Sequence, residues 1–321
     1  ATYMNVTVPS TRPPAYEIGK GVNCVPPNQL SNVQGQYAEY VVIGAGKTGM
    51  DACLFLLKSG VEPRAIRWIM PRDSWILDRA TIQPTGLDKS LTNSVLAAQV
   101  KALAEATDFK DAFRRAEANG SLIRLDPDIW PTMYRCATVT KLELEQLRRI
   151  GSIIRQGRVV KIASDQITLE DGAIATNDST LHIDCSADGL ATRKTLPVFD
   201  DTQITLQSGR TCQQVFSAAF IAHVEAAYEN VEQKNALCTP VPHPDTDIDF
   251  LKTTLADGIN GARWAEDPEL SKWLANARLD GFSAVQPEDQ EPDEATIEQV
   301  QKMQAVGQLA AENIQQILAA L

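Results

Sequence analysis

The chain has 321 residues, of which 44% are hydrophobic and 22% charged. This composition is close to that of ordinary globular domains and excludes the disordered and fibrous classes for most of the chain. A formal net charge of -11 and an isoelectric point near 4.9 argue against nucleic acid as a partner, because a phosphate backbone requires clustered Lys and Arg.

Other whole-chain features point to a cytoplasmic protein without metal or membrane. No run approaches the roughly 18 to 20 apolar residues needed to span a bilayer, and the start lacks a signal peptide. The six cysteines form no C-x-x-C pair, so we expect reduced, mostly buried thiols. His182, His223 and His243 lack metal-ligand spacing. The chain begins at Ala1 rather than Met, which indicates processing, an expression scar or an incomplete sequence.

The first predicted elements form a strand, helix and strand. Residues 1–36 are rich in Pro and Asn and predict an extended arm. Residues 40–43 are apolar and β-branched, and after a glycine turn residues 50–57 have apolar positions at helical spacing. Residues 65–70 predict a second strand that ends at Pro71. The unit has the length of a βαβ crossover, so we expect its strands to be parallel.

The rest of the chain alternates between helical and strand-like patterns. Helices are expected at 88–119 (two, the second closed by Asn119-Gly120), 141–150, 211–228 and 295–321, and strand-like patterns at 153–169 and 181–185. Residues 287–294 are acidic and contain proline, which is typical of a linker. The fold class expected is α/β, with a Rossmann-type parallel sheet and a helical C-terminal segment.

The central motif is Gly44-Ala45-Gly46-Lys47-Thr48-Gly49, which lies between the first predicted strand and its helix. In a dinucleotide fingerprint the first glycine permits the tight turn, the second lets a diphosphate approach the backbone, and the third lets the helix pack on the strand. The helix N-terminus then offers unpaired N–H groups to the phosphates. A P-loop would need a glycine where this chain has Val41, so that alternative is discarded. A glycine turn that binds nothing remains the structural alternative.

The residues after the second strand bear on the choice of cofactor. An acid there binds the ribose hydroxyls of NAD, whereas an arginine accommodates the 2′-phosphate of NADP. The chain continues with Arg72 and Asp73, and Arg79 follows. We predict NADP, since an arginine fork suits a phosphate. NAD stays open if the Asp73 carboxylate faces the ribose, and the structural alternative for the arginines is that they are surface groups paired with Asp73 and Asp78.

These segments resemble a known family. Residues 42–51 (VIGAGKTGMD) and 72–79 (RDSWILDR) are similar to the NADP-binding domain of flavin-containing monooxygenases and related flavoproteins with two dinucleotide-binding domains. The resemblance implies that Gly44, Gly46 and Gly49 line the diphosphate and that Arg72 meets the 2′-phosphate. It is good over residues 37–80 and thin elsewhere. Two weaker similarities, at residues 1–3 and 184–189, resemble the segments where such chains cross between their FAD and NADP domains.

The resemblance implies a division of the chain into four segments. These are an arm (1–36), an NAD(P)-binding Rossmann domain (37–189), the remainder of a FAD-type or helical domain (190–285), and an acidic linker with a terminal helix (286–321). The chain has no second G-x-G-x-x-G and no Phe-x-Gly-x-x-x-His segment in residues 1–36. Monooxygenation is therefore unsupported, and we expect a FAD-binding half upstream or on a partner chain.

The function expected is that of an NADP(H)-dependent, flavin-linked oxidoreductase, or its pyridine-nucleotide-binding portion, acting on an unidentified small molecule. No Ser or Cys has the local signature of a nucleophile, and hydride transfer needs none, because the cofactors carry that chemistry. No catalytic residue is assigned. The alternative is a non-catalytic dinucleotide-binding redox sensor or assembly subunit that uses its terminal helix to hold a partner.

Overall fold

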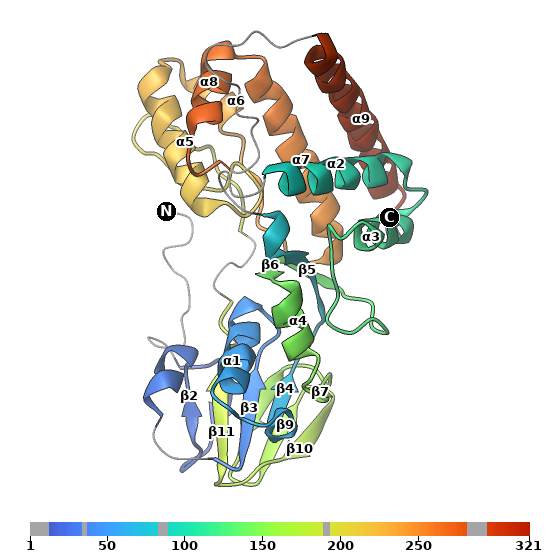
Figure 1. Ribbon diagram of the computed structural model, residues 1–321. Helices are drawn as coiled ribbons and strands as arrows, with labels where there is room; N and C mark the ends of the chain where they lie inside the picture. Colours follow the sequence, from blue (N-terminus) through green and yellow to red (C-terminus); the bar gives the residue numbers. More distant parts are fainter. Residues whose placement is uncertain (1–12, 34–36, 83–88, 189–192, 281–293) are drawn as a thin grey trace. The chain divides into compact units, whose positions relative to one another are not determined.

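A computed structural model describes residues 13–33, 37–82, 89–188, 193–280 and 294–321 (Figure 1). The predicted fold class is confirmed: the chain is α/β, with a parallel sheet of Rossmann type and a helical C-terminal segment. The start of the predicted arm (1–12) and residues 287–293 of the predicted linker lie outside the described residues. Within the described part of the chain, no helix combines the length and the apolar character needed to cross a bilayer.

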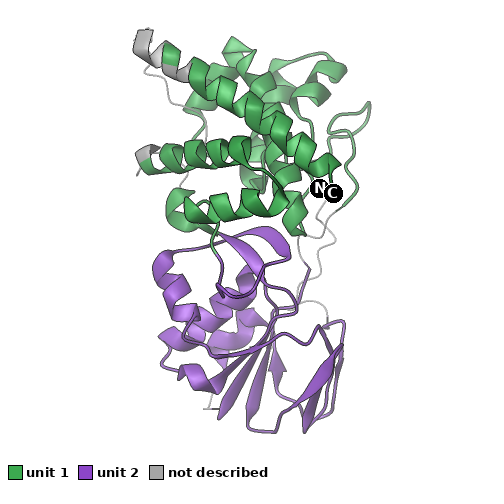
Figure 2. Cartoon of the chain, turned by 90° about the vertical axis from the view of Figure 1, so that its right-hand side faces the viewer, with its two compact units in different colours: residues 1–2, 77–123, 192–321 green, residues 3–76, 124–191 purple. Residues whose placement is uncertain are grey.

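The chain folds into two compact units, coloured separately in Figure 2. Unit 2 is made of residues 3–76 and 124–191, and unit 1 of residues 1–2, 77–123 and 192–321. This division differs from the four predicted segments. Residues 77–123 fall inside the predicted 37–189 domain in sequence, yet they belong to unit 1.

The larger sheet of unit 2 is parallel throughout. Its order is β2 (Cys24–Val25), β11 (Thr180–Asp184), β3 (Glu39–Ile43), β4 (Ile66–Ile69) and β7 (Ser152–Ile154). Since β4 lies on one side of β3 and β11 on the other, the order reverses at the carboxyl ends of β3 and β11. In open α/β sheets such a switch point is where ligands bind.

Local sequence explains why β3 and its helix form. Val41, Val42 and Ile43 are fully or almost fully buried, as a central strand of a covered parallel sheet requires. Helix α1 (Lys47–Lys58) buries Met50, Cys53 and Leu56 at helical spacing. It packs against α4 (Lys141–Leu147), which begins with a capping box at Thr140 and Glu143.

A second sheet lies against the face of the parallel sheet that carries Val41, Ile43 and Ile69. It consists of β1 (Glu17–Ile18), β8 (Val159–Ile162), β9 (Gln166–Leu169) and β10 (Gly172–Ala175). β8, β9 and β10 are antiparallel neighbours, and β1 pairs with β8 in parallel. The single strand-like pattern predicted at 153–169 therefore divides into β7, β8 and β9. Short elements complete this part of the chain: η1 (Pro27–Asn32), η2 (Pro63–Ala65), and β5 (Ser74–Asp78) paired with β6 (Met133–Val139).

Unit 1 is mainly helical in its described residues. It contains η3 (Arg79–Thr81), α2 (Lys89–Glu105), α3 (Phe109–Ala118), α5 (Gln214–Ala227), α6 (Val231–Leu237), α7 (Asp247–Ala265), α8 (Pro268–Asn276) and α9 (Glu294–Ala319). Phe216, Phe220 and Trp264 form the centre of an apolar core that joins α5, α7 and α8. Helix α9 packs on α2 and α7, burying Ile314 and Ile317. Part of the apolar face of α9 is thus buried against other helices of unit 1.

The cysteines follow the prediction in part. Cys24, Cys53, Cys185 and Cys238 are free thiols, and all but Cys24 are buried. Cys136 and Cys212 are disulfide-bonded, so the expectation of six reduced thiols is wrong for these two. No local pattern around either cysteine signals a disulfide bond.

Candidate dinucleotide-binding site

The first glycine of the fingerprint turns the chain out of β3. Gly44 has φ +124°, a conformation that L side chains rarely adopt. Its N–H donates to the Ile69 carbonyl at the end of β4 (3.0 Å). A methyl group on Gly44 would overlap the carbonyl oxygen of Cys185, just beyond β11. Gly44 is therefore required by both its backbone angle and the close approach of the neighbouring strand.

The second glycine has a different environment. Gly46 is the N-cap residue of α1 and makes no side-chain capping bond. A methyl group there would meet no atom within 4 Å. The first N–H groups of a helix have no partner within the helix, and they carry a partial positive charge. The turn thus combines open space at the Gly46 Cβ position with the donors that a helix start carries, a combination that suits a diphosphate.

The third glycine lets the helix lie close to the turn. A methyl group on Gly49 would overlap the Gly44 carbonyl oxygen and would lie 3.4 Å from Trp68 Nε1. Trp68, on β4, is fully buried and donates from Nε1 to that same carbonyl (2.8 Å). Trp68 therefore holds the glycine turn in place. The sequence does not reveal this role, because nothing in the local pattern of β4 distinguishes Trp68 from another buried strand residue.

The other residues of the predicted turn are placed together with the glycines. Ala45 is buried, Lys47 is half-buried and Thr48 is exposed, the last two in the first turn of α1. Lys47 forms an ion pair with Asp51 one helical turn later. All six predicted residues from Gly44 to Gly49 thus lie at one place, where β3 ends and α1 begins.

Arg72 and Asp73 follow β4, at the same edge of the sheet, because the carboxyl ends of neighbouring parallel strands meet there. Arg72 is half-buried and Asp73 is 6% exposed. Both carboxylate oxygens of Asp73 accept hydrogen bonds from Arg155, at 2.7 Å from Nε and 2.9 Å from Nη2. These bonds raise the pKa of the Arg155 guanidinium above its ordinary value. In this structure the Asp73 carboxylate is therefore engaged by protein.

Arg79 lies elsewhere in the fold. It begins η3 in unit 1, whereas the glycine turn, Arg72 and Asp73 belong to unit 2. The neighbouring Asp78 accepts a hydrogen bond from the N–H of Ala80 (3.1 Å). The fingerprint, Arg72 and Asp73 are thus in one compact unit, and Arg79 is in the other.

The end of β11 completes the edge around the turn. Asp184 accepts from the N–H of Ser186 (3.1 Å) and from its hydroxyl (2.5 Å). Burial raises the pKa of Cys185 to about 12 and that of Cys24 to about 11. Both thiols are therefore protonated at neutral pH and are poor nucleophiles. Gly189, the last residue of the similarity at 184–189, lies outside the described residues.

His182 on β11 is a core residue. It is almost fully buried, and its ring nitrogens lie 2.9 Å from the Thr176 hydroxyl and 2.9 Å from the Asn23 carbonyl oxygen. Burial lowers the pKa of its imidazole. A neutral, doubly hydrogen-bonded histidine of this kind joins β11 to the chain around β2.

Comparisons with known proteins add close relatives but no activity. The chain is 50% identical over 287 residues to uncharacterized proteins of Mycobacterium tuberculosis and Mycobacterium bovis. The match covers 89% of this chain and 53% of each relative, so the chain spans about half the length of the curated relatives it matches. No family model matches, and no solved structure matches.

Proposed function

We propose that this chain is an NADP(H)-dependent, flavin-linked oxidoreductase or the pyridine-nucleotide-binding portion of one. The observation that carries the proposal is the environment of the three glycines at the carboxyl ends of β3 and β11. Gly44 and Gly49 are required by close backbone contacts, whereas Gly46 faces open space beside the uncapped start of α1. A turn built only for folding would give no reason for a glycine at position 46.

The residues of unit 2 fit a dinucleotide. Main-chain N–H groups of residues 44–49 would hold the diphosphate, and Arg72 would hold the 2′-phosphate. When bound, the nicotinamide supplies hydride chemistry, and the protein's part is to orient it and exclude water. Ala45 and Thr48 complete the turn without adding charge, and Lys47 adds a cation partly offset by Asp51.

The flavin in this proposal is held by residues outside this chain, either upstream or on a partner. The sequence contains one G-x-G-x-x-G, so it offers no second site of that type. The mycobacterial relatives are about twice as long as the matched region, which leaves room in such proteins for a flavin-binding segment. The substrate is an unidentified small molecule.

A titration with the two reduced nucleotides tests the proposal. We expect NADPH fluorescence to report binding that is tighter than that of NADH. Arg72→Ala should weaken NADPH by about 1–3 kcal/mol, the cost of a charge-assisted contact, and leave NADH nearly unchanged. Arg149→Ala, which removes an exposed arginine of the same unit, is the matched control. Absence of binding by either nucleotide would overturn the proposed function.

A second readout separates the proposal from the non-catalytic alternative. This chain, together with its flavin-binding segment or partner, should be yellow and should lose the visible absorbance of oxidised flavin when NADPH is added. A colourless assembly that binds NADPH and never oxidises it would identify a redox sensor or assembly subunit instead.

A further inference from the structure

Three charged side chains of unit 2 form a cluster beyond the ends of β4 and β7. Arg155 is the residue directly after β7, and it binds both oxygens of Asp73. Its Nη2 also donates to Asp126 (3.0 Å). Asp73 is the most buried of the three, whereas Arg155 and Asp126 are each about 30% exposed. One guanidinium therefore neutralises a buried carboxylate and is itself held by a second acid.

The position of Asp73 connects this cluster with nucleotide recognition as well as with stability. An acid just after the second strand of a dinucleotide fold is the group that accepts hydrogen bonds from the adenosine ribose of NAD. An unpaired carboxylate at that place also repels the dianionic 2′-phosphate of NADP. In this chain the acid is present, but both of its oxygens are occupied by the planar fork of Arg155.

We propose that Arg155 is a specificity-determining residue, which sets the preference for NADPH over NADH by holding the Asp73 carboxylate away from the ribose. This inference rests on the proposed function, since it concerns the same nucleotide site. Arg155 acts through Asp73 and is a positioning residue. Without Arg155, the Asp73 and Asp126 carboxylates lose the guanidinium that binds them both, and their charge opposes the contact proposed between Arg72 and the 2′-phosphate.

The backbone hydrogen bonds of Asp73 support a role of Arg155 in nucleotide preference that is separate from holding the loop. The N–H groups of Thr132 and Met133 both lie 3.2 Å from the Asp73 carbonyl oxygen and donate to it. The main chain of this segment is thus anchored independently of the Asp73 side chain. Loss of Arg155 should therefore release the carboxylate while the loop keeps its path. A purely structural role for Arg155 predicts a different result, namely equal weakening of both nucleotides.

The test measures the ratio of the dissociation constants of NADH and NADPH by fluorescence titration. Arg155→Met should lower this ratio at least tenfold, through weaker NADPH binding and tighter NADH binding. The double variant Arg155→Met with Asp73→Asn should restore most of the ratio, because the amide carries no charge. Asp73→Asn alone should not lower it, because the variant removes the acid and keeps the Arg155 cation. Arg148→Met is the matched control, since Arg148 donates to the carbonyl oxygens of Leu125 and Arg124 and makes no bond to Asp73.

The outcomes separate this inference from the proposed function. If the wild-type chain binds neither nucleotide, the proposed function fails. If it prefers NADPH and a folded Arg155→Met variant keeps the same ratio, only the inference is overturned. Should Arg155→Met not fold, as judged by circular dichroism, Arg155→Lys replaces it. A lysine retains the charge but cannot bind both oxygens in the same way, so a shift of several fold in the same direction is expected, and an unchanged ratio would refute the inference.

Discussion

The three fingerprint glycines differ in what a side chain would meet, and this difference separates folding from binding at single residues. Gly49 faces the Gly44 carbonyl, and Gly46 faces open space. Gly46 also has φ −78° and ψ 179°, which any residue adopts. The backbone at Gly46 therefore gives no reason for glycine, and the proposed ligand does.

Alanine substitution at these two positions should give opposite results. Gly49→Ala should lower the free energy of unfolding by several kcal/mol, of the order of 2–4, because the helix must move away from the turn. Gly46→Ala should keep the free energy of unfolding within about 1 kcal/mol and weaken NADPH binding at least tenfold. Urea denaturation and NADPH titration measure the two effects. A Gly46→Ala variant with unchanged affinity would contradict the proposed path of the diphosphate.

A partly buried carboxylate in unit 1 should make stability depend on pH. Burial raises the pKa of Asp257 to about 6, although Arg210 lies 4.0 Å away and acts in the opposite direction. Arg210 is also paired with Asp280. Because the folded state holds a proton that the unfolded chain has released, the contribution of Asp257 is present below pH 4. It is lost as the pH rises from about 4 to about 6.

The expected loss over this interval is about 1–3 kcal/mol in the free energy of unfolding, measured by urea denaturation at several pH values. Asp257→Asn should flatten the profile between pH 4 and 6 and should stabilise the protein at pH 7.5. Asp201→Asn, at an exposed carboxylate of the same unit, is the control. A profile that is identical in wild type and Asp257→Asn would show that Asp257 does not titrate as stated.

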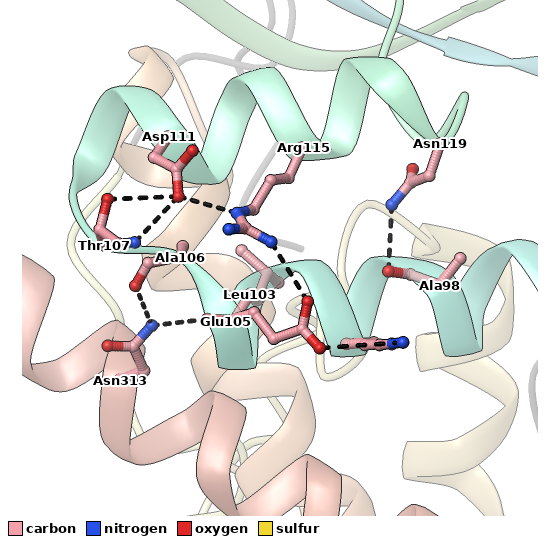
Figure 3. A network of polar contacts seen from close by, with 10 residues as sticks. Ala98, Leu103, Glu105, Ala106, Thr107, Asp111, Arg115, Asn119 and Asn313 are labelled. Atoms are coloured by element: carbon pink, nitrogen blue, oxygen red, sulfur yellow. Dashed lines mark hydrogen bonds and ion pairs between the residues drawn. The ribbon is translucent and has the colours of Figure 1, made fainter.

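At the scale of elements, one asparagine of the C-terminal helix closes the end of another helix. Figure 3 shows Asn313 of α9 beside the end of α2, where its Nδ2 donates to the carbonyls of Leu103 (2.8 Å) and Ala106 (2.7 Å). The last carbonyls of a helix have no partner within it, so these bonds satisfy two of them. Asp111 of α3 fixes the next residues of the chain by accepting from the N–H of Thr107 (3.0 Å). α9 is thus part of the capping of α2.

Removing this cap should destabilise the protein selectively. Asn313→Ala should lower the free energy of unfolding by about 1–3 kcal/mol, because it leaves part-buried carbonyls without donors. Asn313→Asp should be at least as damaging, since a carboxylate cannot donate. Gln316→Ala, an exposed position on the same helix, should change stability by less than about 0.5 kcal/mol. If Asn313→Ala matched this control in denaturation experiments, the capping bonds would carry no net stability.

The sequence predicts correctly those helices and strands whose pattern is contained in residues close together in the chain. Helical spacing and β-branched runs identified β3, α1 and β4 within a few residues of their bounds, and Asn119-Gly120 marked the end of α3. β1 and β2 were missed because each has two residues and exists through pairing with β8 and β11, far away in sequence. No local pattern encodes such pairings.

The same distinction applies to the candidate site. Its glycine turn is contiguous in sequence and can be recognised there. The residues that contact the turn and Asp73 in the fold cannot. Trp68 and Gly44 are 24 residues apart, and Arg155 and Asp73 are 82 apart. Their contacts follow from strand order in the sheet, which the sequence pattern does not specify. For this reason the sequence alone does not decide whether Asp73 binds the ribose of NAD.

Because the proposed site lies in unit 2, we expect the proposed cofactor to change amide hydrogen exchange in unit 2 more than in unit 1. We expect saturating NADPH to slow amide hydrogen exchange at the carboxyl ends of β3 and β4 and in the first turn of α1, all in unit 2. Binding stabilises the folded state by about 2.7 kcal/mol at a concentration one hundred times the dissociation constant. Exchange mass spectrometry should therefore show protection in residues 44–50 and 70–73, and little change in α5 and α8. The Gly46→Ala variant is the control, and protection confined to α5 and α8 would contradict the site.

The position of β11 has a consequence for how the protein is made. This strand lies between β2 and β3 in the sheet, yet it is synthesised after β4 and β7. On the ribosome, at roughly 5–20 residues per second, β3 emerges long before the neighbour that will cover its edge. A bare strand edge is a template for pairing with other chains. The nascent chain is therefore most exposed to misassembly, and most in need of a chaperone, during the interval before residues 180–184 leave the exit tunnel.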